Sequence, residues 1–254
     1  MEGANDGARI LLLHPVGIDL TSWDAVAQRL SSEFRLLRVD LRGHGASAPV
    51  HPAMELADYA VDVYDLVTEL DFAPTGVVGL SFGGMVAQAF ALAYPASVGR
   101  LVLAGCPCTL PDAGRIALSA RGRAAIEQGM ASQVTETLER WFTPGFIAGN
   151  GADAIRDRLL ETDPQAWNSA WQAISHIDTA PRLSEIRLLT LCIAGALDAA
   201  SPPAALNEIA RRIPNARLLV LPDAPHMMQV ECPHLFAAAI KRFFCGEAIG
   251  GAVA

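Results

Sequence analysis

Short, unbroken apolar runs recur along the chain, and segments with a helical spacing of apolar residues separate them. Such runs are typical of strands buried on both faces, as in a parallel sheet. Apolar residues from Leu56 to Leu70 recur every three or four positions, which predicts an amphipathic helix. The runs that we interpret as strands are Arg9–His14, Phe34–Val39, Gly76–Leu80, Arg100–Ala104, Leu188–Ala194 and Leu218–Leu221. The alternation predicts an α/β fold with a mostly parallel sheet of about six strands.

Two further helices are predicted near the ends of the chain. Trp23, Val26 and Leu30 are spaced to share one face of a helix. Ser22 comes directly before Trp23, so we expect Ser22 to cap that helix. After the last apolar run, residues 235–243 place apolar side chains at helical spacing, which predicts a C-terminal helix.

The alternation of strand and helix is interrupted between Pro107 and Arg182. This interval has no convincing strand, but it has several helical stretches and three of the four tryptophans. Asp163 followed by Pro164 is a typical helix start within it. We therefore expect a core formed by residues 1–106 and 183–254 and a helical cap of residues 107–182. The cap would lie over the carboxyl ends of the strands, where such sheets bind ligands.

Composition narrows the classes of function. The chain has 254 residues, 52% hydrophobic and 18% charged, which suffices for one well-packed domain with a small insertion. A net charge of −8 argues against nucleic acid or an anionic membrane as a partner. No run of about 18 apolar residues is present, and residues 1–8 lack the apolar core of a signal peptide. The five cysteines are scattered, so we interpret them as reduced core residues and expect a cytoplasmic protein without a metal or cofactor.

The most informative motif is Gly79-Leu80-Ser81-Phe82-Gly83, which follows a short apolar run and opens an alanine-rich helix. This is the arrangement of a nucleophile elbow, in which a sharp turn between strand and helix presents a serine. The turn is strained, so the positions two before and two after the serine must lack side chains. Such a pentapeptide also occurs by chance, so its place between strand and helix carries the interpretation.

A serine nucleophile needs a base within hydrogen-bond reach and a carboxylate that orients the base. In folds with this elbow the chain order is serine, acid, histidine. Of the three histidines after Ser81, only His226 lies in the loop after the last predicted strand, so we expect it to be the base. Asp198 lies in the loop after the preceding strand and is the expected acid. Asp223 is the alternative, although we expect it to shape its own turn.

An oxyanion hole requires two backbone N–H groups. One is expected from Phe82, which follows the nucleophile. The other is expected from the loop after the first apolar run, where Pro15 has no N–H, so Val16 is the first candidate and Gly17 the second. We expect the His14 side chain to fix this loop rather than to take part in chemistry.

A group of polar residues, Asp40, Arg42 and His44, follows the second apolar run. We interpret it as a hydrogen-bonded turn that supports the site from outside. Neither this group nor His176 with Asp178 has a spacing typical of a metal site.

With these residues identified, the chain resembles the α/β-hydrolase superfamily along nearly its whole length, and within it the 3-oxoadipate enol-lactonases. The elbow is shared by many hydrolases. The segment Arg140–Phe146 is expected in fewer of them, so it carries most of the likeness to the lactonases. The resemblance implies the triad and oxyanion roles given above. The matching segments are Asp40–Ser47, Gly79–Ala87, Arg140–Phe146, Glu161–Pro164, Ile193–Gly195 with Asp198, and Leu219–Pro222 with His226.

The chain departs from that superfamily in two places. Members usually begin with a β-hairpin, but only eight residues precede Arg9, so we expect the hairpin to be missing. The Phe34–Val39 strand would then be an exposed edge of the sheet, which a second copy of the chain in a homodimer would cover. A misassigned chain start would also explain the missing hairpin. In addition, His14-Pro15-Val16 replaces the usual His-Gly and stiffens the oxyanion loop.

The leading hypothesis is hydrolysis of a small-molecule ester or lactone through an acyl-enzyme at Ser81. A lactone with a carboxylate would require a cation in the cap, although each candidate arginine can equally be a solvated helix residue. The candidate substrate contacts are Trp141, Arg121 and Arg123, with Arg115 and Arg140 as further cations. Three alternatives use the same scaffold: hydrolysis of a C–C bond in a vinylogous diketone, perhydrolysis, and ligand sensing without turnover.

Overall fold

The computed structural model describes residues 1–50 and 54–247. Its centre is a seven-stranded sheet with strand order β1-β3-β2-β4-β5-β6-β7. Neighbouring strands run parallel except for β1, which is antiparallel to β3. The strands are β1 (Glu2–Gly3), β2 (Ala8–Leu13), β3 (Phe34–Val39), β4 (Gly76–Leu80), β5 (Arg100–Ala104), β6 (Leu189–Gly195) and β7 (Ala216–Leu221). The mostly parallel sheet predicted from the apolar runs is confirmed.

The N-terminal segment adds one strand to the six that were predicted, while no hairpin precedes β2 among the described residues. Glu2 and Gly3 form a seventh strand, paired with Leu36 and Arg35. Gly3 has a φ of +92°, and a side chain there would overlap the carbonyl oxygen of Phe34, so this pairing requires glycine. A strand of two residues has no periodicity, which is why the pattern did not predict it. Because β1 covers only the start of β3, the expected homodimer stays a prediction.

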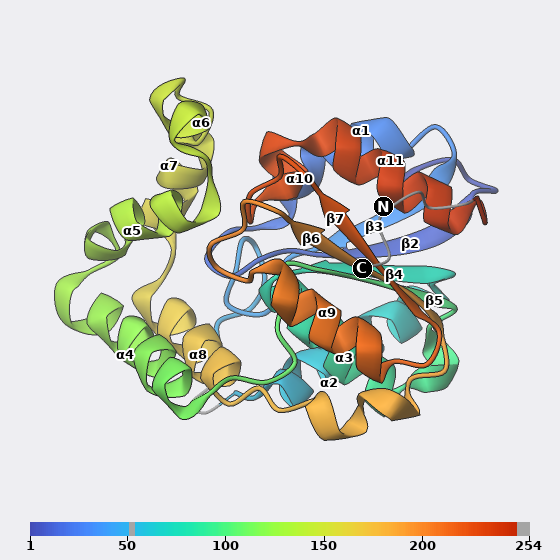
Figure 1. Ribbon diagram of the computed structural model, residues 1–254, viewed down its shortest axis with the longest axis horizontal. Helices are drawn as coiled ribbons and strands as arrows, with labels where there is room; N and C mark the ends of the chain where they lie inside the picture. The colour runs from blue at the N-terminus through green and yellow to red at the C-terminus, as the bar shows by residue number, and fades with distance from the viewer. Residues whose placement is uncertain (51–53, 248–254) are drawn as a thin grey trace.

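Helices cover both faces of the sheet (Figure 1). One face carries α1 (Asp24–Leu30), α10 (Met228–Glu231) and α11 (Pro233–Phe244), and the other carries α2 (Leu56–Glu69), α3 (Phe82–Ala93) and α9 (Pro203–Arg212). The central strand β4 is buried along its whole length, as are the last four residues of β2. The unbroken apolar runs therefore correspond to strands enclosed between two helical layers.

The start of the first helix corrects one local prediction. A 3-10 turn, Leu20–Trp23, precedes α1, and the Asp19 carboxylate accepts a hydrogen bond from the Thr21 N–H. The Ser22 hydroxyl donates to the Asp19 carbonyl oxygen instead of capping the helix. Asp19 takes the capping role because the first turn begins earlier than the apolar pattern indicated.

Five helices between β5 and β6 lie together beside the carboxyl ends of the strands (Figure 1), and we call them the cap. They are α4 (Asp112–Gln128), α5 (Ala131–Trp141), α6 (Pro144–Ala148), α7 (Asp153–Glu161) and α8 (Pro164–Ser175). The predicted start of α8 is confirmed, since the Asp163 carboxylate accepts hydrogen bonds from the N–H groups of Gln165 and Ala166. Two 3-10 turns, Pro95–Ser97 and Ala180–Glu185, complete the elements. Residues 51–53 and 248–254 of the expected core lie outside the described residues.

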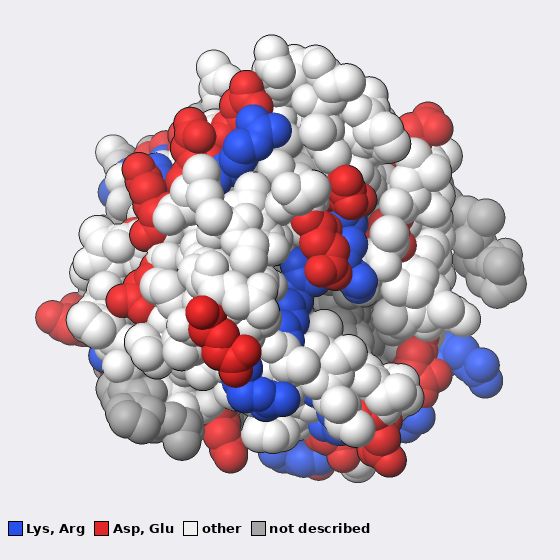
Figure 2. All heavy atoms as spheres, turned by 90° about the vertical axis from the view of Figure 1, so that its left-hand side faces the viewer, with Lys and Arg blue, Asp and Glu red and all other residues white. Residues whose placement is uncertain are grey.

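Figure 2 views the molecule from the side of the cap. Acidic and basic side chains are intermixed around a central hollow on this face. In the parts of the chain that the structure describes, no helix is both long and apolar enough to span a bilayer.

The cysteines are free thiols, and four of the five are buried as predicted. Burial raises the pKa of Cys192 to about 12, so this thiol is inert at neutral pH. Cys245 is exposed, which corrects its assignment to the core, because it follows the last buried residue of α11.

Candidate active site

Ser81 stands at the turn between β4 and α3 with φ of 54° and ψ of −118°, a conformation that is strained for a residue with a side chain. The Ser81 N–H donates to the Ala104 carbonyl oxygen on β5 at 2.8 Å, which anchors the turn. A side chain at Gly79 would overlap the Gly83 backbone, and one at Gly83 would overlap the Leu13 carbonyl oxygen. Both glycines of the motif are therefore sterically required, and the predicted elbow geometry is present.

His226 and Asp198 approach each other from the loops after β7 and β6. His226 Nδ1 lies 2.9 Å from Asp198 Oδ2, and both side chains are buried. The other carboxylate oxygen, Oδ1, accepts the N–H groups of Ala200 and Ser201, each at 2.8 Å. These bonds fix the carboxylate, so Nδ1 of the imidazole carries the proton and Nε2 is left as the basic atom. The alternative acid, Asp223, is exposed.

Ser81, His226 and Val16 line one narrow cavity of about 60 Å³ beneath the cap. The Trp141 ring, from the end of α5, also lines this cavity and lies 6.1 Å from the His226 ring between centroids. Phe82 directly follows Ser81 and is fully buried. The other residues that line the cavity are Met85, Pro107, Leu110, Leu118, Arg121, Arg140, Trp171, Ile174, Ala200 and Ser201.

The loop after β2 is held by the His14 side chain. His14 Nε2 accepts the Leu41 N–H at 2.9 Å, and Nδ1 donates to the Pro15 carbonyl oxygen at 2.6 Å. Burial lowers the pKa of His14 to about 4, so the ring stays neutral and keeps this pattern of one donor and one acceptor. The structural role predicted for His14 is confirmed by these bonds.

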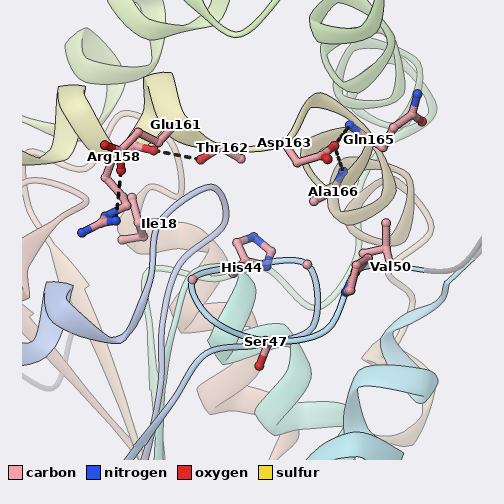
Figure 3. A pocket seen from close by; sticks show the side chains of 13 residues that line it. Ile18, His44, Ser47, Val50, Arg158, Glu161, Thr162, Asp163, Gln165 and Ala166 are labelled. Atoms are coloured by element: carbon pink, nitrogen blue, oxygen red, sulfur yellow. Dashed lines mark hydrogen bonds and ion pairs between the residues drawn. The ribbon is translucent and has the colours of Figure 1, made fainter.

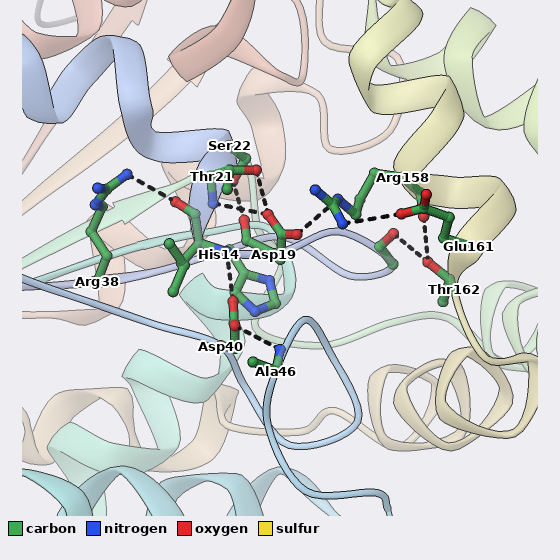
Figure 4. A network of polar contacts seen from close by, with 12 residues as sticks. His14, Asp19, Thr21, Ser22, Arg38, Asp40, Ala46, Arg158, Glu161 and Thr162 are labelled. Carbon is green, nitrogen blue, oxygen red and sulfur yellow. Dashed lines mark hydrogen bonds and ion pairs between the residues drawn. The ribbon is translucent and has the colours of Figure 1, made fainter.

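The turn after β3 supports the same loop from outside the cavity. Asp40 accepts the N–H groups of Leu20 and Ala46 through its two carboxylate oxygens (Figure 4). Arg42 forms a bidentate ion pair with Asp62 on α2, with both distances 2.6 Å. None of these side chains lines the cavity that contains Ser81, in agreement with the predicted supporting role.

The cap contacts the loop after β2 through Arg158 and Thr162, for which the sequence predicted no role at the site. Arg158 Nε lies 2.8 Å from Asp19 Oδ2, and Thr162 Oγ1 lies 2.8 Å from the Gly17 carbonyl oxygen (Figure 4). Gly17 has a φ of +71°, and a side chain there would overlap the Trp167 ring. The end of α7 and the start of α8 thus fix the segment that contains Val16.

The cap also contacts the loop that contains His226. The Met227 N–H donates to the Trp141 carbonyl oxygen at 3.0 Å. The Glu231 carboxylate accepts both the N–H and the hydroxyl of Thr143. These bonds give the segment Arg140–Phe146 a structural role beside the histidine.

Two of the four candidate arginines, Arg121 and Arg140, line the cavity. Arg123 is exposed and donates to Ser119 Oγ at 2.6 Å, so the structure does not bring it to Ser81. Positions two apart on a helix point in different directions, which separates Arg121 from Arg123. Arg115 donates to carbonyl oxygens at the end of α8 and holds α4 and α8 together.

A larger groove of about 540 Å³ lies between the turn at Gly43–Val50 and the junction of α7 with α8 (Figure 3). His44, Arg158 and Asp163 line it, but Ser81 and His226 do not. We place the site at the smaller cavity because only that one joins a strained serine to a histidine–carboxylate pair. Within residues 1–50 and 54–247, no cluster of three or more His, Cys, Asp or Glu side chains could hold a metal ion.

The alpha/beta hydrolase family matches residues 10–239 of the chain. The chain is 28% identical over 248 residues to a 3-oxoadipate enol-lactonase from Acinetobacter baylyi, covering 95% of this chain and 91% of that protein. It is 29% identical over 252 residues to a pimeloyl-[acyl-carrier protein] methyl ester esterase from Nitrosomonas europaea, covering 94% and 96%. The crystal structure of the enol-lactonase from Burkholderia xenovorans has a TM-score of 0.89 and 29% identity, covering 97% of this chain and 95% of that chain. These relatives are named for the cleavage of lactones or esters.

Proposed function

The chain belongs to the alpha/beta hydrolase family, and from this premise we propose that it hydrolyses a small-molecule ester or lactone with Ser81, His226 and Asp198 as its catalytic triad. The observation that carries the proposal is the buried His226–Asp198 pair at 2.9 Å, whose histidine lines the same narrow cavity as a strained serine. The names of the relatives support ester or lactone cleavage.

In the first half of the reaction, Ser81 Oγ attacks the carbonyl carbon while His226 Nε2 takes the hydroxyl proton. Asp198 keeps the imidazole in the required tautomer and stabilises the imidazolium without taking its proton. The tetrahedral intermediate then collapses, the C–O bond of the leaving alkoxide breaks, and His226 returns the proton to that oxygen. In a lactone this alcohol stays attached to the acyl group.

In the second half, His226 removes a proton from water, and the hydroxide attacks the acyl-enzyme carbonyl. Collapse of the second intermediate breaks the acyl–Ser81 bond, and His226 returns its proton to Ser81 Oγ, which releases the carboxylic acid and restores the free enzyme. In both halves the oxyanion accepts the N–H groups of Val16 and Phe82, which are preorganised because both residues are buried and the loop is held by His14. Loss of one such donor costs about 3–4 kcal/mol of barrier.

The test is pre-steady-state hydrolysis of p-nitrophenyl acetate. We expect a burst of p-nitrophenol equal to the enzyme concentration, and the loss of both burst and turnover in Ser81→Ala. Ser184→Ala, at an exposed position in the Ala180–Glu185 turn, is the matched control and keeps both. A Ser81→Ala protein that turns over at the wild-type rate would overturn the proposal.

A substrate panel separates the remaining readings of the same site. Preference for lactones and simple esters supports the proposal, whereas preference for vinylogous diketones would assign C–C hydrolysis. If a compound of the panel binds tightly without being turned over, and binds Ser81→Ala with the same affinity, the site would have a ligand-sensing role. The cytoplasmic location stays a prediction from the cysteine content.

A further inference from the structure

The groove of about 540 Å³ lies outside the catalytic cavity, and the proposed reaction does not use it (Figure 3). The turn Gly43–Val50 forms one wall, and the junction of α7 with α8 forms the other. The walls are packed together at Gly43, where an added Cβ would lie 2.5 Å from Val50 Cγ1 and 3.0 Å from Ala166 Cβ. The position of one wall relative to the other is therefore fixed by direct contact.

His44 is a buried polar residue in this groove, only 4% exposed, and Figure 3 shows its ring between the two walls. Nδ1 lies 3.1 Å from the Arg42 carbonyl oxygen, which can only accept a hydrogen bond, so Nδ1 carries the proton. Burial lowers the pKa of His44 to about 3, which keeps the ring neutral. Nε2 is therefore an acceptor, and it is buried without a hydrogen-bond partner.

The unpaired Nε2 of His44 restricts the chemistry of a ligand for the groove. A buried acceptor without a donor is unfavourable, and such atoms are commonly completed by water or by a ligand. The completing group must carry an N–H or O–H, which excludes an ionised carboxylate, an ether or a quaternary ammonium.

The charged side chains of the groove favour a cation. Arg158 is the only Lys or Arg among the described residues that line it, and it pairs with Asp19 at 2.8 Å and with Glu161 at 3.1 Å. The Asp163 carboxylate also lines the groove and makes no ion pair within residues 1–50 and 54–247. Its Oδ1 accepts two N–H groups at the start of α8, so this helix end is already capped, and Oδ2 is left for a ligand.

We propose that this groove is an effector site for a primary aliphatic amine in its protonated form. The ammonium group donates to His44 Nε2 and pairs with Asp163, and the alkyl chain lies against the buried apolar residues Ile18 and Ala166. A primary ammonium combines three N–H donors with a positive charge in one compact group. An alcohol offers a donor without the charge, and a quaternary ammonium offers the charge without a donor.

The His44 ring connects the groove to the expected oxyanion hole. Its centroid lies 5.0 Å from that of His14, which holds the loop with Val16, and 5.9 Å from that of Phe82. Because Nε2 is covered in the structure, the ring must turn slightly to meet the ammonium group, and this movement changes both contacts. We expect a bound amine to lower kcat about 3–10-fold with little change in KM. This effect on turnover rests on the proposed function, whereas the binding itself does not.

The test of binding is isothermal titration calorimetry near neutral pH with n-butylammonium chloride. Butyltrimethylammonium chloride, butan-1-ol and sodium butyrate are the comparison compounds. We expect n-butylammonium to bind at least about 10-fold more tightly than each of them, as for a charged hydrogen bond. In protein labelled with ¹⁵N-histidine, we expect the His44 Nε2 signal to move upfield during the titration because this nitrogen accepts a hydrogen bond.

Two variants test the residues that would hold the amine. Asp163→Asn keeps a capping side chain on α8 but loses the charge, so we expect the affinity for n-butylammonium to fall about 3–10-fold. Asp157→Asn, at an exposed position on α7 outside the groove, is the matched control and keeps the affinity. His44→Phe keeps an aromatic ring beside Phe82 but lacks Nε2, so it should lose the preference for n-butylammonium over butyltrimethylammonium.

Equal affinities of the wild-type protein for these two cations would overturn the site. So would an unchanged affinity in Asp163→Asn together with a stationary His44 signal, and this outcome can be read even if His44→Phe does not fold. The effector role is measured as kcat for phenyl acetate at saturating n-butylammonium, after subtraction of the uncatalysed rate, and an unchanged kcat would overturn it. In each case the burst from p-nitrophenyl acetate and its loss in Ser81→Ala would still stand, so failure of the groove is distinguishable from failure of the proposed function.

Discussion

Gly105, at the end of β5, is the residue that leaves room for the His226–Asp198 pair. Its φ is +50°, and a Cβ there would lie 3.3 Å from both Asp198 Oδ2 and His226 Nδ1. The Gly105 N–H donates to the Ile193 carbonyl oxygen, which ties this turn to β6. The position is therefore constrained both by backbone conformation and by two functional atoms.

We expect Gly105→Ala to lower the free energy of unfolding by about 1–2 kcal/mol through backbone strain. Because the new methyl group also presses on the pair, we expect kcat for p-nitrophenyl acetate to fall about 10-fold or more. Gly129→Ala is the matched control, since Gly129 has a φ of +77° and no atom within 4 Å of its added Cβ. Gly129→Ala should lower the free energy of unfolding and leave kcat unchanged. Equal kcat values in the two variants would contradict this role of Gly105.

The buried histidines His14 and His44 make the stability of the protein sensitive to acid. Burial lowers the pKa of His14 to about 4, and burial together with the adjacent His14 lowers the pKa of His44 to about 3. In the unfolded chain both titrate near pH 6.5. As pH falls below about 6.5 the unfolded state takes up protons that the folded state does not, so stability is lost from pH 6.5 towards pH 4, and each histidine contributes at most about 1.4 kcal/mol per pH unit.

This pH dependence is measured as the free energy of urea unfolding between about pH 5 and pH 6.5. We expect His14→Gln to reduce the slope by roughly the contribution of one histidine. His234→Gln, on the exposed side of α11, is the matched control and should keep the wild-type slope. A wild-type slope in His14→Gln would show that this ring is not excluded from protonation in the folded state.

The triad residues that the sequence predicts share one property: each follows a predicted strand. Ser81, Asp198 and His226 could be ranked because parallel strands end at the same edge of a sheet, and chain order assigned their roles. Arg121 and Arg123 could not be separated in this way. Which of them reaches the cavity depends on how α4 packs on α8, and that packing has no signature in residue spacing.

At the scale of elements, the junction between α7 and α8 holds the loop after β2. Thr162 lies at this junction, and its hydroxyl shares one proton between the carbonyl oxygens of Gly17 and Arg158, at 2.8 and 3.0 Å. Asp163, the next residue, caps α8. The turn between the two helices therefore sets the position of the expected oxyanion donor Val16, which precedes Gly17.

We expect Thr162→Val to loosen this loop and to lower kcat about 10-fold with little change in KM, because the oxyanion forms only after substrate binding. Thr68→Val is the matched control: Thr68 Oγ1 donates to the Tyr64 carbonyl oxygen within the exposed part of α2, far from the loop in sequence. Steady-state kinetics on one ester measures both constants. A change in KM alone would place Thr162 in ground-state binding instead.

The elements themselves followed from short runs of four to seven residues, which located six of the seven strands. β1 has two residues and depends on Gly3 fitting against β3, so no run could reveal it. The first helix was predicted at its apolar face, but its capping residue was wrong, since hydrogen bonds at a helix start depend on the exact backbone path. The pattern of apolar residues thus locates helices and strands better than it locates the residues at which they begin and end.

At the scale of the whole molecule, the cap is attached to the core at both sides of the cavity. Thr162 and Arg158 bind the loop that contains Val16, while Trp141 and Thr143 bind the segment after His226. The nucleophile and the histidine belong to the core, and the arginine and aromatic lining belongs to the cap. The sequence predicted a cap over the strand ends, but not that its attachments would lie on the same loops that hold the site.

Glu231→Gln tests whether this second attachment holds the cap. Glu231 accepts two hydrogen bonds from Thr143, one on each carboxylate oxygen. The amide of the variant has a single acceptor oxygen and no charge, so one bond is lost and the other is weakened. We expect faster hydrogen exchange in residues 131–148 and unchanged exchange in β2 and β3, measured by mass spectrometry. Glu185→Gln, which removes the exposed i,i+3 ion pair with Arg182, is the matched control and should leave both regions unchanged. The Trp141 carbonyl oxygen lies in the same segment and accepts the Met227 N–H, so kcat should fall when hydrogen exchange in this segment becomes faster. A fall in kcat without faster exchange would place Glu231 in the chemistry instead of in the attachment of the cap.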